Sequence, residues 1–351
     1  MRILVDIGHP AHVHFFKNFI WEMDKRGHQL LVTARDKDIA LHLLTVYGIE
    51  YIAVGKAGKG KLSFIREWIG RDREIYSIAR RFRPDIITGI HNPCVAHVAR
   101  LTGAKSIIFT DTEHAKIANM VTFPFSDVVC TPSCFKKNLG KKHVRYNGYH
   151  ELAYLHPNYF KPDPSVLSEL GLSENDMFII IRFVSWGASH DIGQSGFDLA
   201  TKRKLVDEIA KYGRVMITSE GPLPEEFEEY QIKTPPEKLH DLLYYATMYF
   251  GEGGTMATEA AILGIPSIYV SPLWDTMGNF IELGSKYELI HSFRETDKAI
   301  QKALELLQQP DLKENWVKKR QRLLVDKIDA TQFVVDFIEN FPESCNQIKR
   351  T

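Results

Sequence analysis

A histidine-rich stretch near the N-terminus holds the first side chains that could do chemistry. His9, His12 and His14 follow the short apolar run Arg2–Ile7, and Asp6 lies inside that run. An imidazole titrates near pH 6.5 when nothing perturbs it, so one of these rings could act as a general base toward an acceptor hydroxyl. The other rings could equally be structural, so the stretch predicts a site without deciding its chemistry.

A metal site is the alternative for this stretch. A His-x-His pair after a strand occurs in metal-dependent hydrolases, and imidazoles and carboxylates are common ligands of zinc and iron. Further ligands would have to come from the ends of later strands. The residues that could supply them are His91, Asp111, Glu113 and His114.

The segment from Tyr249 to Val270 has the residue types of an anion site. Gly253 and Gly254 join an apolar run to a helical pattern, and Glu259 follows just over one turn into that helix. Glycine lets a ligand approach the backbone closely, and the N–H groups of a helix start favour a negative charge. The pattern predicts a diphosphate site at Gly253–Thr255, with Glu259 accepting hydrogen bonds from ribose or sugar hydroxyls. A structural turn capped by Thr255 is the simpler interpretation.

A second loop, Ser185–Asp191, is predicted to contact the same ligand. It follows the carboxyl end of an apolar run, where open parallel sheets bind their ligands. Hydroxyls, glycine N–H groups and positive side chains are suited to phosphate. The candidate donor contacts in and around this loop are Arg182, Ser185, Gly187, Ser189 and His190, and Glu252, directly before Gly253, is a further donor candidate.

Alternating apolar runs and amphipathic stretches must position these residues. In the first half, strands are expected at 2–7, 29–33, 51–54, 85–88, 106–109 and 127–130. Between the first two, Val13, Phe16, Ile20 and Met23 recur at helical spacing, with Gly27 as a C-cap. Strand–helix–strand repetition predicts a parallel sheet covered by helices on both faces.

A proline-rich polar stretch at 157–177 predicts a linker, after which the alternation restarts. Further strands are expected at 178–184, 214–218, 248–250 and 267–270. We therefore predict an α/β protein with two Rossmann-like doubly wound parallel-sheet domains facing a cleft. The predicted parts are an acceptor domain at 1–156, a donor domain at 178–325, and a helix at 326–351 that crosses back onto the first domain.

Composition narrows the class of protein. The 351 residues include 44 Lys+Arg and 44 Asp+Glu, so the chain lacks the basic excess of a duplex nucleic-acid binder. Four scattered cysteines do not suggest a disulfide framework, which favours a reducing compartment. No signal peptide or run of about 18 apolar residues is visible. We expect a cytoplasmic protein that is at most peripheral to the inner membrane face.

The stretch 56–73 mixes Lys and Arg with large apolar residues. One interpretation is a segment that lies on an anionic membrane, where a lipid-linked acceptor would be met. The simpler interpretation is a helix that packs on the core with one face and exposes its basic face to solvent.

The segment 249–270 resembles the donor-site motif of GT-B glycosyltransferases and of the related UDP-N-acetylglucosamine 2-epimerases. Gly253 and Glu259 keep the spacing found in the peptidoglycan N-acetylglucosaminyltransferase that makes lipid II, and Gly264 and Pro266 keep its strand entry. The first half is similar to the same transferase in the order of Pro84-Asp85, Gly89, Gly103, Thr112–His114 and Asn119, and in the His12-Val13 turn. Over its whole length the chain resembles an uncharacterised prokaryotic family placed near GT-B enzymes.

The resemblance implies glycosyl transfer from a nucleotide-diphosphate sugar, preferably a UDP-sugar, to a lipid- or glycan-linked acceptor. It makes His12 the candidate base, with Glu113 or His114 nearby. The implied acceptor and cleft residues are His9, His14, His91, Asn92, Asp111, Asn147 and Tyr149. Enzymes of this fold neutralise the leaving diphosphate with helix dipoles and side chains, so no metal or other cofactor is required.

Two departures from the family pattern leave the nucleotide base and the sugar open. The N-terminal loop reads IGHPAHVH in place of a Gly-Thr-Gly-Gly pattern, and Thr and Met stand between Gly254 and Glu259. A 2-epimerase or hydrolase acting on one nucleotide sugar remains an alternative, as does a catalytically silent nucleotide-sugar binder. The sequence predicts no nucleic-acid partner and leaves the oligomeric state open.

Overall fold

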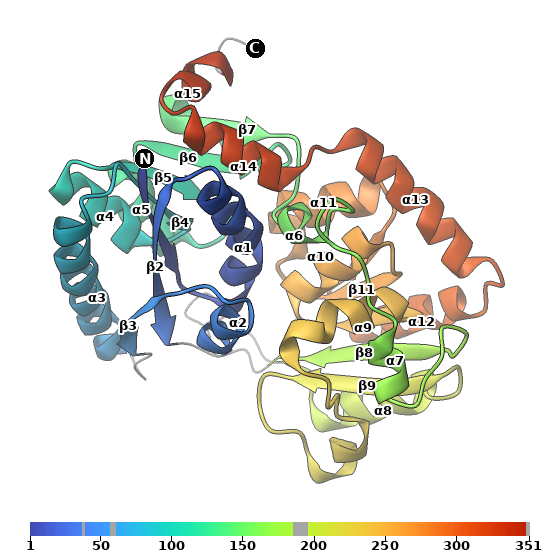
Figure 1. Cartoon of the computed structure of the whole chain (residues 1–351). Helices are drawn as coiled ribbons and strands as arrows, with labels where there is room; N and C mark the ends of the chain where they lie inside the picture. The colour runs from blue at the N-terminus through green and yellow to red at the C-terminus, as the bar shows by residue number, and fades with distance from the viewer. Residues whose placement is uncertain (37–38, 57–60, 185–195, 349–351) are drawn as a thin grey trace. The chain divides into compact units, whose positions relative to one another are not determined.

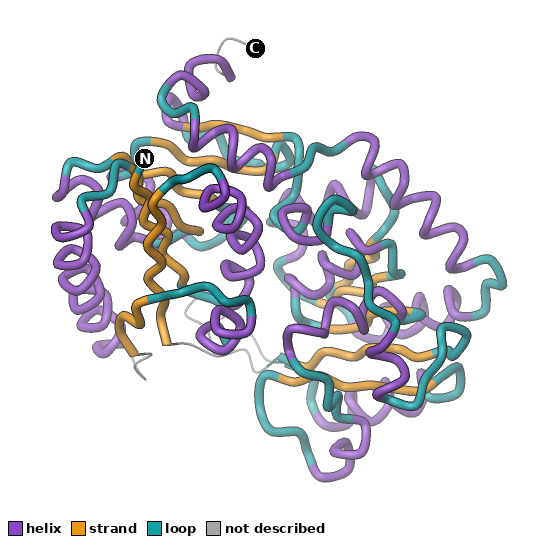
Figure 2. Tube along the Cα trace, viewed as in Figure 1, coloured by secondary structure: helices purple, strands orange, loops and turns teal. Residues whose placement is uncertain are grey.

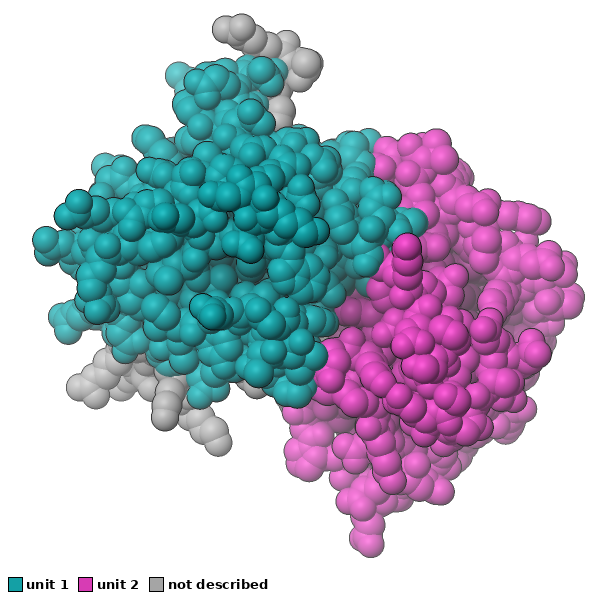
Figure 3. Space-filling view, in the orientation of Figure 1, with its two compact units in different colours: residues 1–159, 328–351 teal, residues 160–327 magenta. Residues whose placement is uncertain are grey.

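A computed structural model of the whole chain shows two compact units (Figure 3). The structure describes residues 1–36, 39–56, 61–184 and 196–348, and the side chains of 56–67 and 348 are not described. The first unit comprises residues 1–159 and 328–351, and the second unit comprises residues 160–327. Among the described helices, none has the length and apolar character needed to cross a membrane.

The first unit is built on a parallel sheet of seven strands in the order β3-β2-β1-β4-β5-β6-β7. Its strands are β1 (Arg2–Ile7), β2 (Gln29–Asp36), β3 (Ile52–Lys56), β4 (Ile86–Ile90), β5 (Lys105–Phe109), β6 (Val128–Pro132) and β7 (His143–Tyr146). Its helices are α1 (Pro10–Lys25), α2 (Ala40–Val46), α3 (Lys61–Phe82), α4 (Pro93–Thr102), α5 (Lys116–Thr122), α6 (Leu152–Leu155), α14 (Ala330–Glu339) and α15 (Glu343–Ile348).

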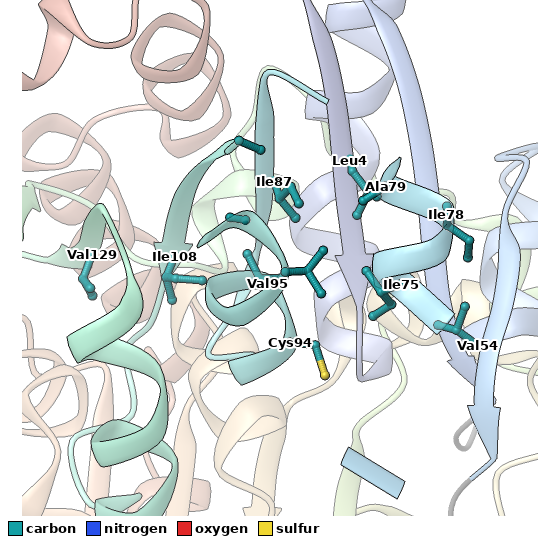
Figure 4. Packing of buried hydrophobic residues seen from close by; sticks show 13 residues of the cluster. Leu4, Val54, Ile75, Ile78, Ala79, Ile87, Cys94, Val95, Ile108 and Val129 are labelled. Carbon is teal, nitrogen blue, oxygen red and sulfur yellow. The ribbon is translucent and has the colours of Figure 1, made fainter. Parts of the chain in front are cut away.

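Helices cover both faces of this sheet, as the alternating pattern predicts. α1 and α2 lie on one face, and α3 and α4 lie on the other (Figures 1 and 2). Under α3 and α4, Leu4, Ile75, Ile87 and Val95 pack in one buried apolar cluster (Figure 4). Side chains alternate along a strand, so Asp6 lies on the same face as Leu4, toward α3. The sheet therefore directs the Asp6 carboxylate toward the helices that cover this face, α3 among them.

α1 shows how the local sequence sets an element. Pro10 occupies the first turn, where a missing N–H costs nothing, and Gly27 follows the helix with a φ of 79°. The predicted face of Val13, Phe16, Ile20 and Met23 is buried, as expected. The buried surface is wider than predicted, because His14, Phe15, Asn18 and Phe19 are also enclosed.

The second unit has a parallel sheet of five strands in the order β12-β11-β10-β8-β9. Its strands are β8 (Phe178–Phe183), β9 (Arg214–Ser219), β10 (Met248–Gly251), β11 (Ser267–Val270) and β12 (Ile290–Phe293). Its helices are α7 (Ser165–Glu169), α8 (Leu199–Ile209), α9 (Leu239–Tyr245), α10 (Gly254–Leu263), α11 (Gly278–Ser285), α12 (Thr296–Leu307) and α13 (Leu312–Asp326). Two Rossmann-like parallel-sheet units confirm the predicted fold class.

The unit boundaries differ in detail from the predicted ones. Residues 160–177, predicted as linker, lie in the second unit, because α7 buries Val166 and Leu167 there. The chain re-enters the first unit at Ile328, whose N–H donates to the Asn147 carbonyl at 2.9 Å. β7 (HVRY) and β12 (IHSF) were not expected from the sequence, because polar residues interrupt their apolar residues.

Candidate functional site

Each sheet has one point at which the strand order reverses direction. In the first unit it lies between β1 and β4, and in the second it lies between β8 and β10. Open α/β sheets bind ligands outside the carboxyl ends of the strands at such a point. The residues that pair across these two points are Asp6 with Gly89, and Arg182 with Gly251.

A buried carboxylate occupies the reversal point of the first unit. Asp6 is fully buried, and Arg71 of α3 donates to both of its oxygens through Nη2, at 3.1 and 3.0 Å. Thr33 donates through Oγ1 at 2.7 Å, and the Asn92 side-chain amide also donates. A buried charge is tolerated when it is paired and hydrogen-bonded in this way. Asp6 therefore holds β1, β2, α3 and α4 together.

Two glycines make room for the Arg71 side chain and for the backbone of Asp6. Gly55 has a φ of 67°, and a Cβ there would lie 2.5 Å from Cγ of Arg71. A Cβ on Gly89 would lie 2.9 Å from the Asp6 carbonyl oxygen. Glycine is required at both positions, because any larger residue would displace the chain or the Arg71 side chain.

His9 and His12 lie at the start of α1, with ring centroids 5.9 Å apart. His9 is the N-cap, and its Nδ1 accepts from Ala11 N–H at 3.2 Å. His12 Nδ1 accepts from Gly8 N–H at 3.2 Å. A neutral ring that accepts through Nδ1 carries its proton on Nε2. In this arrangement His12 is a hydrogen-bond donor through Nε2, and it can act as a base only after it releases Gly8.

His14 is directed away from these two rings. It is buried on α1, with its ring centroid 5.9 Å from that of Tyr47 and 5.3 Å from that of Tyr154. The three histidines therefore do not converge on one point. Within the described residues, no three His, Cys, Asp or Glu side chains form a metal-ligand group.

His91 and Asn92 follow β4 directly. His91 has a φ of 45°, stacks on Phe123 with ring centroids 5.5 Å apart, and its Nδ1 lies 3.3 Å from Thr110 Oγ1. Asn92 caps α4, because its Oδ1 accepts from Cys94 N–H at 3.1 Å. Asn92 thus bridges the helix start and the Asp6 carboxylate.

The segment after β5 brings a carboxylate and an imidazole together. Asp111 Oδ2 lies 3.7 Å from His150 Nδ1. His150 is buried against the Phe15 ring, and burial lowers the pKa of its imidazole, although the Asp111 charge acts in the opposite direction. Tyr149 beside it is fully buried, and Asn147 accepts from Ser133 Oγ at 3.3 Å. Tyr149 therefore supports this corner from within, whereas Asn147 lies at the surface.

Glu113 was predicted to be close to the reacting groups, but its carboxylate holds a neighbouring turn. It is 3% exposed, and Oε1 accepts from Lys136 N–H at 3.2 Å. Its carbonyl accepts from Lys137 Nζ at 2.7 Å. His114 is half-buried, and its carbonyl accepts from Lys116 N–H. These contacts join Glu113 to the segment at 136–137, and its role near the reacting groups stays a prediction.

Arg182 brings positive charge to the reversal point of the second unit. Its guanidinium donates to Thr218 Oγ1 at 2.9 Å and to Glu220 Oε1 at 3.0 Å. A Cβ on Gly253 would lie 3.0 Å from Arg182 Cγ and 3.4 Å from its Nε. The arginine therefore lies against the segment that begins α10.

α10 begins directly after β10, as the Gly-Gly pattern predicts. Gly253 is the N-cap, no side chain caps the helix start, and Thr255 is exposed. The Tyr249 hydroxyl donates to the Gly253 carbonyl at 2.9 Å. A Cβ on Gly254 would lie 3.2 Å from the Tyr269 hydroxyl, so aromatic side chains close one side of this turn. The helix dipole and the Arg182 charge both favour an anion here.

Glu259 lies just over one turn into α10 and is 7% exposed. His240 Nε2, on α9, lies 3.0 Å from Glu259 Oε1, and His240 is also 7% exposed. The ring N–H donates to the carboxylate. Sequence reasoning missed His240, because nothing in its own segment marks it as different from other helical residues.

Glu252 contacts the ends of the second predicted loop. Its Oε2 accepts from Val184 N–H at 3.4 Å, and its Oε1 accepts from Phe197 N–H at 3.0 Å. The two carboxylate oxygens thus tie together the residues on either side of 185–195. The predicted contacts Ser185, Gly187, Ser189 and His190 lie outside the described residues.

The basic stretch 56–73 becomes part of β3 and α3. Arg71, predicted to lie on a solvated face, is only 4% exposed because it pairs with Asp6. Ile69 is 49% exposed. The side chains from 56 to 67 lie outside the described residues.

The chain is similar to one protein family and to one further protein over most of its length. The family model described as "Protein of unknown function (DUF354)" matches residues 1–341. The uncharacterized protein MJ0665 of Methanocaldococcus jannaschii is 26% identical over 308 residues, which cover 83% of this chain and 88% of that protein.

Two solved structures share the fold at low sequence identity. SsfS6, a glycosyltransferase of Streptomyces sp. SF2575, has a TM-score of 0.64 and 14% identity, covering 97% of this chain and 100% of that chain. The UDP-GlcNAc 2-epimerase from Neisseria meningitidis, bound to UDP-GlcNAc, has a TM-score of 0.69 and 13% identity, covering 97% of this chain and 100% of that chain. The GT-B class predicted from the motifs is confirmed, and the chain belongs to the DUF354 family.

Proposed function

We propose that this protein transfers a glycosyl group from a nucleotide-diphosphate sugar, preferably a UDP-sugar, and that the second unit binds this donor. The start of α10 carries the proposal: Arg182 lies against Gly253, and Glu259 follows just over one turn later. A helix N-terminus and an arginine attract a diphosphate, and a carboxylate accepts hydrogen bonds from sugar hydroxyls. SsfS6 is a glycosyltransferase, and the N. meningitidis epimerase was captured with a nucleotide sugar.

In the proposed reaction, the bond between the anomeric carbon and the diphosphate oxygen breaks while the acceptor oxygen bonds to that carbon. Negative charge develops on the leaving diphosphate, so fixed donors at α10 and Arg182 lower the barrier. The acceptor loses its proton to a base of the first unit. His12 serves in this role when it releases Gly8 N–H, and Asp111 is the second candidate.

A 2-epimerase or hydrolase that acts on one nucleotide sugar is the second candidate function. The structural likeness to an epimerase bound to UDP-GlcNAc favours it. The two reactions differ in what they need, because transfer requires an acceptor. Incubation with UDP-GlcNAc alone, followed by NMR of the sugar, separates them: an epimer or free sugar indicates the second function, and an unchanged sugar favours transfer.

The donor assignment is tested by thermal unfolding of the full chain with UDP, GDP, CDP and dTDP, with and without EDTA. A ligand at a hundred times its Kd should stabilise the folded state by about 2.7 kcal/mol. We expect UDP to give the largest shift, and EDTA to leave it unchanged. A chain that responds to none of the four nucleotides would contradict the proposal.

Glu259→Gln sharpens this test. The substitution removes the negative charge and one acceptor oxygen, so UDP affinity should fall by about tenfold to a hundredfold, since hydrogen bonds to charged groups contribute about 1.5–3 kcal/mol. Glu305→Gln is the matched control, because Glu305 forms an exposed ion pair with Lys302 elsewhere in the second unit. Equal affinities in the two variants would remove Glu259 from the site.

A further inference from the structure

His240 and Glu259 form a buried pair between neighbouring helices of the second unit. α9 packs on α10, and the ring nitrogen Nε2 of His240 lies 3.0 Å from Glu259 Oε1. Each residue is 7% exposed. Bulk water therefore contributes little to orienting the carboxylate.

The surroundings of Glu259 make this contact important for its geometry. Every residue of α10 from Met256 to Leu263 is buried, so the helix has no solvated face on which a carboxylate would normally lie. A buried carboxylate keeps its charge only when polar groups compensate for lost hydration. The hydrogen bond from His240 gives Glu259 such a polar partner and fixes the position of Oε1.

We propose that His240 is a positioning residue of the donor site: it holds Glu259 so that the carboxylate accepts hydrogen bonds from the vicinal hydroxyls of a ribose. This inference rests on the proposed function and adds a ligand preference, for ribonucleotides over 2′-deoxyribonucleotides. A carboxylate can accept several hydrogen bonds at once, so accepting from His240 does not exclude accepting from a diol. Binding is tighter when the accepting group is already held in its bound orientation.

The test measures Kd by calorimetry for UDP and 2′-deoxy-UDP on the full chain. His240→Leu removes the donor, and UDP affinity should fall by about tenfold, whereas 2′-deoxy-UDP affinity should change little. In His240→Gln the amide nitrogen can take the place of Nε2, so most of the UDP affinity should return. His240→Asn is polar but too short to reach, and it should behave like His240→Leu.

Leu243→Val is the matched control for altered packing of α9, because Leu243 is fully buried on the same helix. It should lower the melting temperature without changing the preference for UDP. If His240→Leu fails to fold, the UDP affinities of His240→Gln and His240→Asn are compared instead. Both variants keep a polar amide, and only the glutamine is long enough to reach Glu259.

A double-variant cycle separates positioning from a general structural effect. If His240 acts through Glu259, then adding His240→Leu to Glu259→Gln should cause no further loss of UDP affinity. Equal UDP affinity in His240→Leu and the parent, or additive losses in the double variant, would overturn the inference. If the parent chain binds no nucleotide, the proposed function is refuted, and the role of His240 is refuted with it. If UDP binding depends on Glu259 but not on His240, only the proposed role of His240 is refuted.

Discussion

The reversal points of the two sheets have the same topology and opposite chemistry. In the first unit the pair across this point is Asp6 and Gly89, and the Asp6 carboxylate is fully engaged by α3 and its neighbours. In the second unit it is Arg182 and Gly251, and the arginine lies against the start of α10. In both, glycine on one strand makes room for the charged residue on the next.

This difference indicates what each unit can bind. In the first unit the Asp6 charge is paired with Arg71 inside the fold. In the second unit Arg182 pairs with Glu220 and also lies against the start of α10. The second unit combines a helix dipole with a cation, which suits an anion. This contrast supports the proposal that the second unit binds the diphosphate.

Each unit also has a carboxylate next to a buried histidine. Glu259 and His240 are within hydrogen-bond distance at 3.0 Å, whereas Asp111 and His150 are separated by 3.7 Å. Asp111 is also more exposed, with 24% of its side chain accessible. The second unit thus holds its carboxylate fixed, and the first leaves its carboxylate freer to meet a ligand or a proton.

Removing the charge that neutralises Asp6 should produce the largest effect. Arg71→Met leaves a buried carboxylate without its cation, and the unfolding free energy of the first unit should fall by about 3–5 kcal/mol. Arg73→Met, at an exposed position of the same helix, is the control. Native-state hydrogen exchange of peptides from β1 and β4 measures the loss. A change below about 1 kcal/mol would mean that the ion pair does not hold the first unit together.

The corresponding change in the second unit should affect binding more than stability. Arg182→Met should weaken UDP by about tenfold and leave uridine, which has no phosphate, almost unchanged. Arg203→Met removes an exposed ion pair with Glu226 and serves as the control. Calorimetry of UDP and uridine measures both. Similar losses for the two ligands would show that Arg182 does not contact phosphate, and the contrast between the two units would lose its basis.

The smallest effect concerns pH. Burial, with help from Arg145, lowers the pKa of His143 in the first unit to about 4, and burial likewise lowers the pKa of His291 in the second to about 4. The unfolded chain, with an imidazole pKa near 6.5, takes up these protons first as the pH falls. Stability from each group is therefore lost between about pH 6.5 and 4, by about 1 kcal/mol after allowance for partial solvent screening.

His143→Gln and His291→Gln should each flatten the pH dependence of their own unit. Urea unfolding at pH 7 and at pH 4.5, read by hydrogen exchange in each unit, measures the difference between variant and parent. A variant with the parent's full pH dependence would show that its histidine takes up a proton at the same pH in the folded and unfolded chains.

The sequence by itself determined the elements and their class. Short apolar runs, the helical spacing of Val13 and Phe16, and the Gly253-Gly254 junction are local patterns, because they depend on backbone geometry over a few residues. They were enough to predict two parallel sheets, a helix start that suits a diphosphate, and Glu259 beside it.

The tertiary structure alone decided the partners of the charged groups. Arg71 lies 65 positions from Asp6, and His240 lies 19 positions from Glu259. No local pattern encodes such pairs, since they depend on which strands and helices become neighbours. For the same reason Arg71 was predicted to lie on a solvated helix face, whereas packing placed it in a buried ion pair with Asp6.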